Sequence, residues 1–277
     1  MGKTALILEG GAMRAIYTAG VLDAMLQETF FPDKIYAVSA GACHACSFLS
    51  HQFGRNFEIM KKYTNDPRYI SFRNLIFHGG VFGFKFIFDD LPNRLQPFDY
   101  EMCEKNIEHL TITVTNCKTG KAEYLTADTV HDMFEYCQAS SSMPLLSCVK
   151  KINGIPYLDG SIADSVPIRK SIEDGNEKHI VVLTRDRNYR KHPSKVSTKL
   201  IRLIYAAYPE IAKTHSKRYI NYNDTLDFIE LLENEGKITV IRPSQPINVA
   251  HVERNVGVLT NIYKMGFDDA LAKIKLL

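Results

Sequence analysis

The first 53 residues alternate between short apolar runs and segments with helical spacing, and this alternation limits the fold more than any other feature. Residues 4–8 and 35–38 are predominantly apolar runs, which are typical of buried strands. Residues 13–27 and 40–53 carry apolar side chains at the spacing of helices that pack along one face. A strand–helix–strand–helix order implies a parallel sheet with right-handed crossovers. We therefore expect an α/β fold.

The later part of the chain extends this pattern and adds two hairpins. Short strand-like segments flank Thr119-Gly120-Lys121 and again Asn153-Gly154, and Asn-Gly is a strong hairpin signal. The further expected strands are residues 110–116, 122–126, 148–152, 155–158, 179–183 and 237–241, and the further expected helices are residues 130–140, 197–234 and 252–274.

The length of the chain fits one large α/β domain or two small ones, since it has 277 residues. No internal repeat, low-complexity tract or long linker divides it. We therefore predict a single domain over residues 1–277, with a motif-bearing core at about 5–185 and a C-terminal helical extension at about 195–277.

The composition is that of an ordinary globular protein, with 45% hydrophobic and 23% charged residues. Disorder, collagen and coiled coil are thereby excluded as descriptions of the whole chain. No apolar run reaches the ~18 residues that a membrane-spanning helix needs. The N-terminus lacks the long apolar region of a signal peptide, so we expect a cytoplasmic protein.

The six cysteines are too few for a disulfide framework, and we expect free thiols in a reducing compartment. Cys43 and Cys46 have the spacing of a redox or zinc motif, but no second Cys/His pair accompanies them. We therefore interpret them as small buried residues of one helix and predict no metal site.

Positive charge is concentrated in one segment although the net charge is only +3. Residues 185–202 contain seven Lys/Arg and one acid. A solvated surface explains this pattern, and so does contact with an anionic membrane. Nucleic acid is not expected as a partner, because no aromatic residues are interleaved in a nucleic-acid-binding motif. The cations that would meet the membrane are Arg185, Arg187, Arg190, Lys191, Lys195 and Lys199.

Two turns at the ends of the first two expected strands carry the residues best suited to chemistry. Ser39 stands directly between a strand and a helix, as in a nucleophile elbow that exposes the serine Oγ. Ala37 and Gly41 are small enough for such a sharp turn. The other turn contains Gly10 and Gly11, whose backbone N–H groups can stabilise an oxyanion at the same edge of the sheet.

Each turn also has a simpler interpretation. Ser39 can be a helix N-cap, and Gly10-Gly11 can be part of a phosphate-binding loop. A dinucleotide fingerprint would need glycine where Ala12 and Ala15 stand and an acid at the end of the second strand. No Gly-Lys-Ser/Thr follows the first turn either, so both nucleotide-binding motifs fail.

A nucleophilic serine needs a base, and none of the nine histidines lies in a recognisable motif. An aspartate can serve if it is held beside the serine Oγ. Asp159 ends a predicted hairpin strand and precedes Gly160, a place where aspartate is also common as a turn residue.

Four separated motifs of this chain resemble those of the patatin family of lipid acyl hydrolases, in particular the bacterial patatin-like phospholipases. The matching segments are Gly10-Gly11-Ala12-Met13-Arg14, the elbow from Ala37 to Gly41, Ala139-Ser140-Ser141-Ser142-Met143-Pro144, and Asp159-Gly160-Ser161 followed by Asp164-Ser165-Val166-Pro167. The chain departs from the family pattern by having alanine at 12, 15 and 37 and serine at 161.

The resemblance implies a three-layer α/β/α sandwich with a mainly parallel central sheet. It implies hydrolysis of lipid carboxylic esters, phospholipase A- or lysophospholipase-like, through a Ser39–Asp159 dyad and an acyl-serine intermediate. Gly10, Gly11, Ala12 and Arg14 would form the oxyanion hole, without metal or organic cofactor. The alternative is a non-catalytic protein that binds lipid or nucleotide through the Gly10-Gly11 loop.

The expected substrate draws attention to residues 81–91, which carry phenylalanine at every second position from Phe82 to Phe88. These rings could belong to the core, as most buried aromatic side chains do. We expect that part of the segment instead lines or covers the acyl site.

Overall fold

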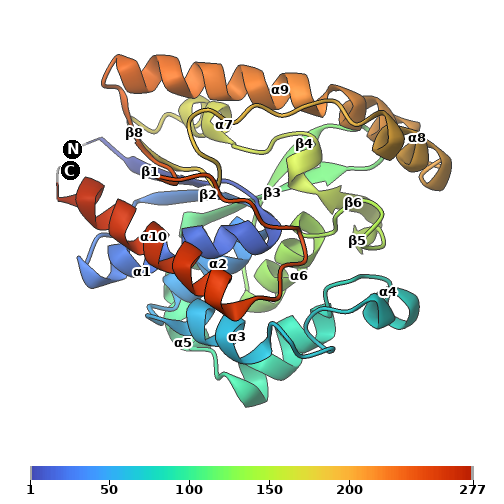
Figure 1. Ribbon diagram of the computed structural model, residues 1–277, viewed down its shortest axis with the longest axis horizontal. Helices are drawn as coiled ribbons and strands as arrows, with labels where there is room; N and C mark the ends of the chain where they lie inside the picture. Colours follow the sequence, from blue (N-terminus) through green and yellow to red (C-terminus); the bar gives the residue numbers. More distant parts are fainter. Residues whose placement is uncertain (1, 276–277) are drawn as a thin grey trace.

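A computed structural model describes residues 2–275 of the chain, so the outermost residues of the expected domain lie outside the described part. The molecule has three layers, with a central sheet between two groups of helices (Figure 1). The sheet has eight strands in the order β5-β6-β3-β2-β1-β7-β8, and β4 pairs with β3 off this path. The neighbouring strands β3, β2, β1, β7 and β8 are parallel to one another. Strands β4, β5 and β6 pair in antiparallel fashion. The mainly parallel α/β/α sandwich is thereby confirmed.

The strands lie close to their predicted positions. They are β1 (Thr4–Leu8), β2 (Lys34–Val38), β3 (Leu110–Asn116), β4 (Ala122–Thr126), β5 (Lys150–Ile152), β6 (Ile155–Asp159), β7 (Lys178–Val182) and β8 (Ile238–Ile241).

The helices include several that the sequence did not predict, mainly in residues 55–106 and at α7. They are α1 (Ile16–Gln27), α2 (Ala40–Leu49), α3 (Arg55–Tyr63), α4 (Phe72–His78), α5 (Tyr100–Asn106), α6 (Val130–Ser140), α7 (Ile168–Glu173), α8 (Lys195–Ile204), α9 (Pro209–Asn234) and α10 (Val256–Ile274), with 3₁₀ turns η1 (Ala12–Ala15), η3 (Ile107–His109) and η4 (Gly160–Ile162) and a π-helix η2 (Phe86–Leu95).

Two predicted helices are shorter than expected. The helix after Ser39 ends at Leu49 instead of continuing to residue 53, and Gly54, with φ of 74°, starts a new helix. The long C-terminal helix is divided into α8 and α9 because Pro209 starts the second.

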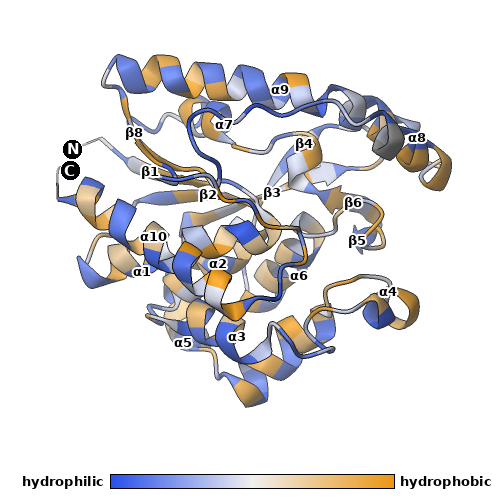
Figure 2. Cartoon of the chain, in the orientation of Figure 1, coloured by the Kyte–Doolittle hydropathy of each residue, from blue (hydrophilic) through white to orange (hydrophobic). Residues whose placement is uncertain are grey.

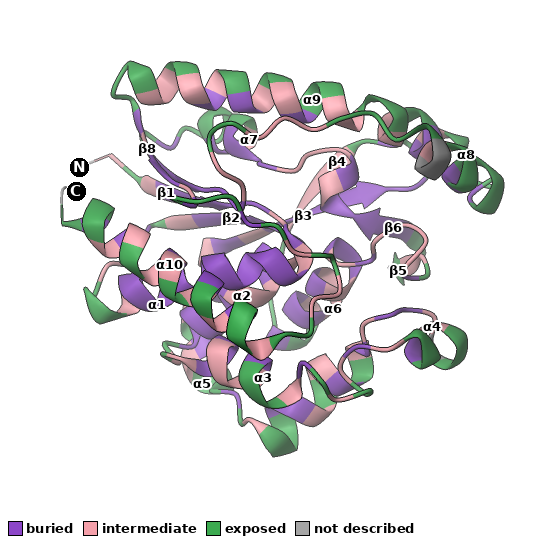
Figure 3. Ribbon diagram, viewed as in Figure 1, coloured by how far each residue is buried: buried purple, intermediate pink, exposed green. Residues whose placement is uncertain are grey.

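Alternate side chains of a strand point to opposite faces of the sheet, so those of β1 belong to two different apolar clusters. Leu6 and Leu8 of β1 pack with α1, α2, α6 and α10, whereas Ala5 and Ile7 pack with α7 and α9. The central strands and most of α2 are buried (Figure 3). The carboxyl ends of β1 and β2 are consequently held at one edge of a rigid scaffold.

Helices α1 and α10 cross at two glycines and thereby tie the C-terminal part of the chain to the first helix. A Cβ atom on Gly20 would lie 2.1 Å from the Tyr263 carbonyl oxygen. A Cβ atom on Gly266 would lie 2.0 Å from the Tyr17 carbonyl oxygen. Strand β8 also joins the sheet beside β7. We therefore propose that the C-terminal segment is part of the same domain.

We predict that Gly266→Ala lowers the free energy of unfolding by about 1–3 kcal/mol, because the new methyl group forces two packed helix backbones apart. Thermal or urea unfolding, followed by circular dichroism, would measure the loss in a single transition. Gly257→Ala on the same helix is the control, since the nearest atom to its new Cβ is the Asn255 Oδ1 at 3.3 Å. Equal stability of the Gly266→Ala protein and the wild type would contradict the packing argument.

Candidate active site

Ser39 lies at the sharp turn between β2 and α2, in a backbone conformation that L-residues rarely adopt. Its φ is 54° and its ψ is −127°. The Ser39 backbone N–H donates to Ser140 Oγ at 2.7 Å, and Ser140 Oγ donates to the Thr113 carbonyl at 2.7 Å. This buried chain of hydrogen bonds fixes the elbow against β3 and α6. Ser140 belongs to one of the four family motifs, but the sequence alone does not predict its contact with Ser39.

Small residues around Ser39 are required by close backbone approaches. A Cβ atom on Gly41 would lie 2.8 Å from the Glu9 carbonyl oxygen, and a Cβ atom on Gly10 would lie 3.1 Å from the Ser39 Cβ. The glycine-rich turn and the elbow therefore touch each other. Larger side chains at either position would push the two turns apart.

Asp159 is brought to Ser39 by the antiparallel pairing of β6 with β3. The Ser39 hydroxyl donates to Asp159 Oδ2 at 2.8 Å, and the Ser161 backbone N–H donates to Asp159 Oδ1 at 2.8 Å. The Asp159 side chain is thus oriented through both carboxylate oxygens, and the residue is only 1% exposed. Gly160 permits this turn, since a Cβ atom there would lie 2.1 Å from the Thr113 carbonyl oxygen.

The first turn presents backbone N–H groups near Ser39. Within the described part of the chain, the N–H groups of Gly10 and Gly11 have no hydrogen-bond acceptor. Ala12 has a φ of 48° and begins η1, where helix N–H groups are unpaired by geometry. Ala12 also lines the same cavity as Ser39. These groups are available to an oxyanion.

Arg14 takes a different direction from the other residues of this turn. Its backbone N–H donates to the Gly11 carbonyl at 3.1 Å and so closes the turn. Its side chain is not among those that line the cavity containing Ser39. The guanidinium instead lies near Arg185 and Glu9, which both influence its pKa.

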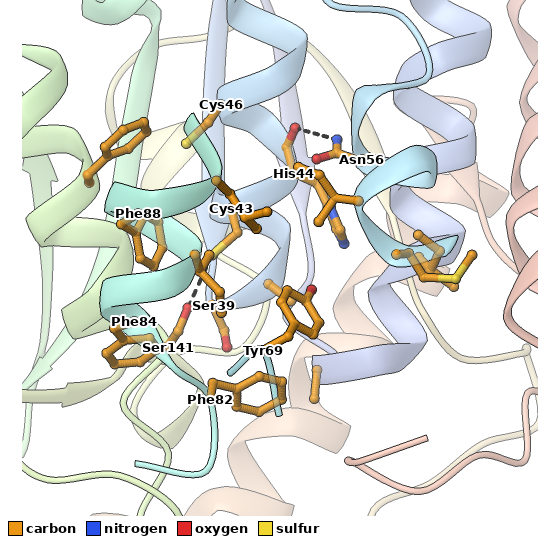
Figure 4. Close-up of a pocket in the computed structure, with 18 of the residues that line it drawn as sticks. Ser39, Cys43, His44, Cys46, Asn56, Tyr69, Phe82, Phe84, Phe88 and Ser141 are labelled. Carbon is orange, nitrogen blue, oxygen red and sulfur yellow. Dashed lines mark hydrogen bonds between the residues drawn. The ribbon is translucent and has the colours of Figure 1, made fainter. Parts of the chain in front are cut away.

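A large apolar cavity begins at Ser39 and runs between α2, α3, α6 and η2 (Figure 4). Phe82, Phe84 and Phe88 lie in its wall, whereas Phe86, the other ring of the alternating pattern, packs against Tyr63 and Arg68 instead. The cavity holds about 1020 Å³ of empty space, including space open to solvent. Its other apolar lining residues include Met13, Ile16, Ile59, Met60, Tyr69, Ile87, Leu91, Phe98, Phe134 and Met143.

His44 is the histidine of this cavity, and it is not hydrogen-bonded to the Ser39–Asp159 pair in the described structure. Burial lowers the pKa of His44 to about 4, so its imidazole is neutral at pH 7. Within residues 2–275, no three His, Cys, Asp or Glu side chains are placed to hold a metal ion. None of the helices in this part of the chain is both long and apolar enough to cross a membrane.

The basic segment of residues 185–202 divides into two parts. Arg187 is ion-paired with Glu230 at 3.1 Å, and Arg190 is ion-paired with Asp227 at 3.1 Å, both on α9. Acids far away in sequence therefore offset much of the local charge. Lys199 is exposed on α8 and forms no ion pair with any described residue.

Comparisons with known proteins show what this chain is similar to. A family model described as Patatin-like phospholipase matches residues 6–171, and one described as Domain of unknown function (DUF6363) matches residues 208–277. Uncharacterized protein YjjU of Escherichia coli (strain K12) is 23% identical over 279 residues, covering 96% of this chain and 75% of that protein. Probable lipid hydrolase 463L of Invertebrate iridescent virus 6 is 27% identical over 193 residues, covering 63% of this chain and 65% of that protein. The crystal structure of VipD from Legionella pneumophila aligns with 99% of this chain and 67% of its own, with 13% identity and a TM-score of 0.48.

The Patatin-like phospholipase model defines the class as lipid acyl hydrolases, which confirms the resemblance found in the sequence motifs. The chain belongs to the patatin-like phospholipase family, since that model covers more than half of its length. Family membership supports lipid ester hydrolysis as its general activity.

We predict that the free energy of unfolding of Ser39→Gly is about 1–2 kcal/mol higher than that of Ser39→Ala, because glycine tolerates the strained backbone of the elbow. Ser39→Ala removes the same hydroxyl but keeps a Cβ atom, so the backbone strain stays. Chemical denaturation of the two variants isolates the strain from the lost hydrogen bond. Equal stabilities of the two variants would show that the elbow stores no such strain.

Proposed function

We propose that this chain is a serine acyl hydrolase that cleaves carboxylic esters of lipids. The observation that supports this most directly is the 2.8 Å hydrogen bond from Ser39 Oγ to Asp159 Oδ2 at the end of an apolar cavity. A nucleophile, a base and a site for an acyl chain are thereby in one place.

In the proposed reaction, Ser39 Oγ attacks the ester carbonyl carbon while Asp159 takes the hydroxyl proton. The N–H groups of Gly10, Gly11 and Ala12 stabilise the negative oxygen, and the positive charge of Arg14 lies nearby. Collapse of the tetrahedral intermediate breaks the bond to the alcohol oxygen, which receives a proton from Asp159. Water then attacks the acyl-serine, gives a proton to Asp159, and releases the fatty acid as Ser39 regains its proton.

The acyl chain would lie in the apolar cavity, against Phe82, Phe84 and Phe88. Such a cavity suits a phospholipase A- or lysophospholipase-like enzyme, because burial of each CH₂ group contributes about 0.8 kcal/mol. A non-catalytic lipid- or nucleotide-binding protein is the alternative. It would need neither the strained Ser39 nor the oriented Asp159.

We predict that a fluorophosphonate labels Ser39 and that Asp159→Asn lowers kcat/KM on a p-nitrophenyl ester by about 10²–10⁴-fold, because asparagine cannot accept the proton. Ser39→Ala should be at least as damaging, and the double variant little worse than either, since the pair acts as a unit. Mass spectrometry would locate the label, and circular dichroism would confirm folding.

His44→Gln is the matched control, because His44 lines the same cavity one helical turn beyond Ser39. Its kcat/KM should stay within a few-fold of the wild type. A folded Asp159→Asn protein with wild-type turnover would refute the dyad. Absence of labelling together with a thermal shift by a nucleotide would favour the binding protein.

We also propose that the protein acts in the cytoplasm and docks on the anionic inner face of the membrane through α4 and α8. These helices lie at the same end of the molecule, opposite the termini (Figure 1), and both contain hydrophobic residues (Figure 2). Six large apolar side chains there are 44% to 78% exposed: Phe72, Ile76, Phe77, Leu200, Leu203 and Ile204.

An anionic bilayer fits this end of the molecule better than a neutral apolar partner, because cations accompany the apolar side chains. Lys195, Lys199 and Arg202 are exposed on α8, and Arg73 is exposed on α4. Within the described residues none of these four cations is ion-paired, unlike Arg187 farther up the basic segment. Apolar insertion and attraction to lipid phosphates therefore act together.

We predict that Leu203→Ser weakens binding to phosphatidylcholine–phosphatidylglycerol vesicles, measured by sedimentation, by about five- to tenfold. The loss is limited because the burial of one leucine side chain contributes at most roughly 1.5–3 kcal/mol to binding. Lys199→Gln should weaken binding to these vesicles but not to phosphatidylcholine alone. Leu231→Ser is the control, since Leu231 is 54% exposed on α9. Equal binding to both vesicle types at low salt, or equal loss in the control, would refute the docking surface.

A further inference from the structure

Four cationic side chains from separate parts of the chain come together at the carboxyl edge of the sheet, outside the apolar cavity. Arg14 belongs to η1, Arg185 follows β7, Lys191 lies in the loop before α8, and Arg218 belongs to α9. Burial, together with Arg218, Arg14 and Arg185, lowers the pKa of Lys191 to about 7. Burial and Arg185 likewise lower the pKa of Arg14. The contacts agree with this proximity: Lys191 Nζ lies 4.6 Å from the centre of the Tyr222 ring, Arg185 Cζ lies 4.3 Å from the centre of the Tyr189 ring, and these two ring centres are 6.1 Å apart.

The cluster has too few negative partners within the described part of the chain. Glu9 is the acid that raises the pKa of both Arg14 and Lys191, but Glu9 Oε1 accepts from the Tyr222 hydroxyl at 2.7 Å and Oε2 accepts from Thr184 Oγ1 at 3.0 Å. Arg14 is only 8% exposed, and its Nε has no hydrogen-bond acceptor among the described residues. A buried cationic N–H group without an acceptor is costly, so an anion supplied from outside would stabilise this arrangement.

The cations are held in place by the surrounding fold. The Lys191 backbone N–H donates to Asn223 Oδ1 at 2.9 Å, and Asn223 Nδ2 donates to the Lys191 carbonyl at 3.0 Å. Lys191 Nζ lies 4.6 Å from the centre of the Tyr222 ring. Arg185 Nη1 donates to the Ile247 carbonyl at 3.1 Å. Such anchoring is expected of a built site and not of freely solvated side chains.

Hydrogen bonds connect the cluster to the Ser39–Asp159 pair. Arg218 Nε and Nη2 donate to the carbonyl and the hydroxyl of Ser161 at 2.6 and 2.7 Å. The Ser161 N–H in turn donates to Asp159. Arg14 lies two residues beyond Ala12, which lines the cavity with Ser39. None of the four cations lines that cavity. The cluster therefore lies beside the Ser39–Asp159 pair but outside the apolar cavity.

We propose that Arg14, Arg185, Lys191 and Arg218 form a subsite for a phosphate group carried on the alcohol part of the ester substrate. This inference rests on the proposed function, in which the acyl chain occupies the apolar cavity and the alcohol part leaves it at Ser39. A phosphate offers several acceptor oxygens to the guanidinium and ammonium groups. The chain would then prefer phosphate-bearing esters to neutral glycerides with the same acyl group.

The subsite also gives a role to the part of the chain beyond the family match. Arg185, Lys191 and Arg218 all lie after residue 171, where the Patatin-like phospholipase match ends. Arg218 lies within residues 208–277, which match the domain of unknown function. That segment would supply one wall of the subsite as well as packing on the sheet.

The test compares kcat/KM for hexanoyl-lysophosphatidic acid and monohexanoylglycerol, two soluble esters that differ in the phosphate. We expect the wild type to prefer the former by at least tenfold, and Lys191→Met to lower this ratio about tenfold, mainly through KM. Arg185→Gln is a second variant in case the first fails to fold. Lys217→Met, which removes an exposed charge next to Arg218 in sequence, should keep the wild-type ratio.

Inorganic phosphate separates the two sources of the ligand. Competitive inhibition by millimolar phosphate that Lys191→Met abolishes would mean that the subsite takes free phosphate as well as the lipid headgroup. A lower ratio without such inhibition would mean that phosphate is recognised only as part of the ester. A wild-type ratio near one, or a ratio that neither Lys191→Met nor Arg185→Gln changes, would overturn the subsite.

The proposed function and the proposed subsite can be tested independently of each other. Fluorophosphonate labelling of Ser39 and turnover of monohexanoylglycerol report on the dyad alone. If neither is seen, binding of hexanoyl-lysophosphatidic acid to the wild type by calorimetry tests the subsite. Binding that Lys191→Met weakens about tenfold would support it, and binding that Lys191→Met leaves unchanged would refute it.

Discussion

The hydrogen bond between Ser39 and Asp159 is the interaction on which the arrangement of the candidate site depends. It joins residues 120 positions apart in sequence, and both are nearly inaccessible to solvent. Ser39 is placed by a parallel strand that runs into a helix, whereas Asp159 is placed by an antiparallel strand on β3. The mixed character of the sheet is therefore what allows the two side chains to meet. Ser140 and Gly160 both contact Thr113 of β3, so this one strand supports the serine and the aspartate together.

Much of this could be predicted from the sequence, because short buried strands and glycine turns leave local signals. The strands β1 and β3 and the helix α6 begin and end at the predicted residues. The helices α3 and α4 were missed because, with 9 and 7 residues, they are shorter than the stretch over which helical periodicity can be recognised. Their form depends on contacts such as the bridge between Ile70 and Phe82, which no local pattern reveals.

In the candidate site too, features with a local sequence signal could be predicted, whereas features that depend on residues far away in sequence could not. Ser39 and Asp159 were found as motif residues, and the structure places them within one hydrogen bond of each other. Their roles remain proposals that the labelling experiment addresses. The direction of the Arg14 side chain could not be foreseen, because it depends on neighbours such as Arg185 and Tyr222 that lie far away in sequence. The ion pairs of Arg187 and Arg190 were hidden for the same reason, since a count of charges along a segment ignores the acids of α9.

The close crossing of α1 and α10 has a consequence for how the chain can be divided. All four motifs lie before residue 170. A boundary there would follow from the sequence if each group of motifs were a folding unit. A shortened chain that ends after β7 would lose the partner of Gly20 and the helix that covers Ala5 and Ile7. It would also leave β7 as an unpaired edge strand, which invites association with other copies. On our proposal of a single domain, the part of the chain that carries the four motifs is therefore smaller than the part that folds as a unit.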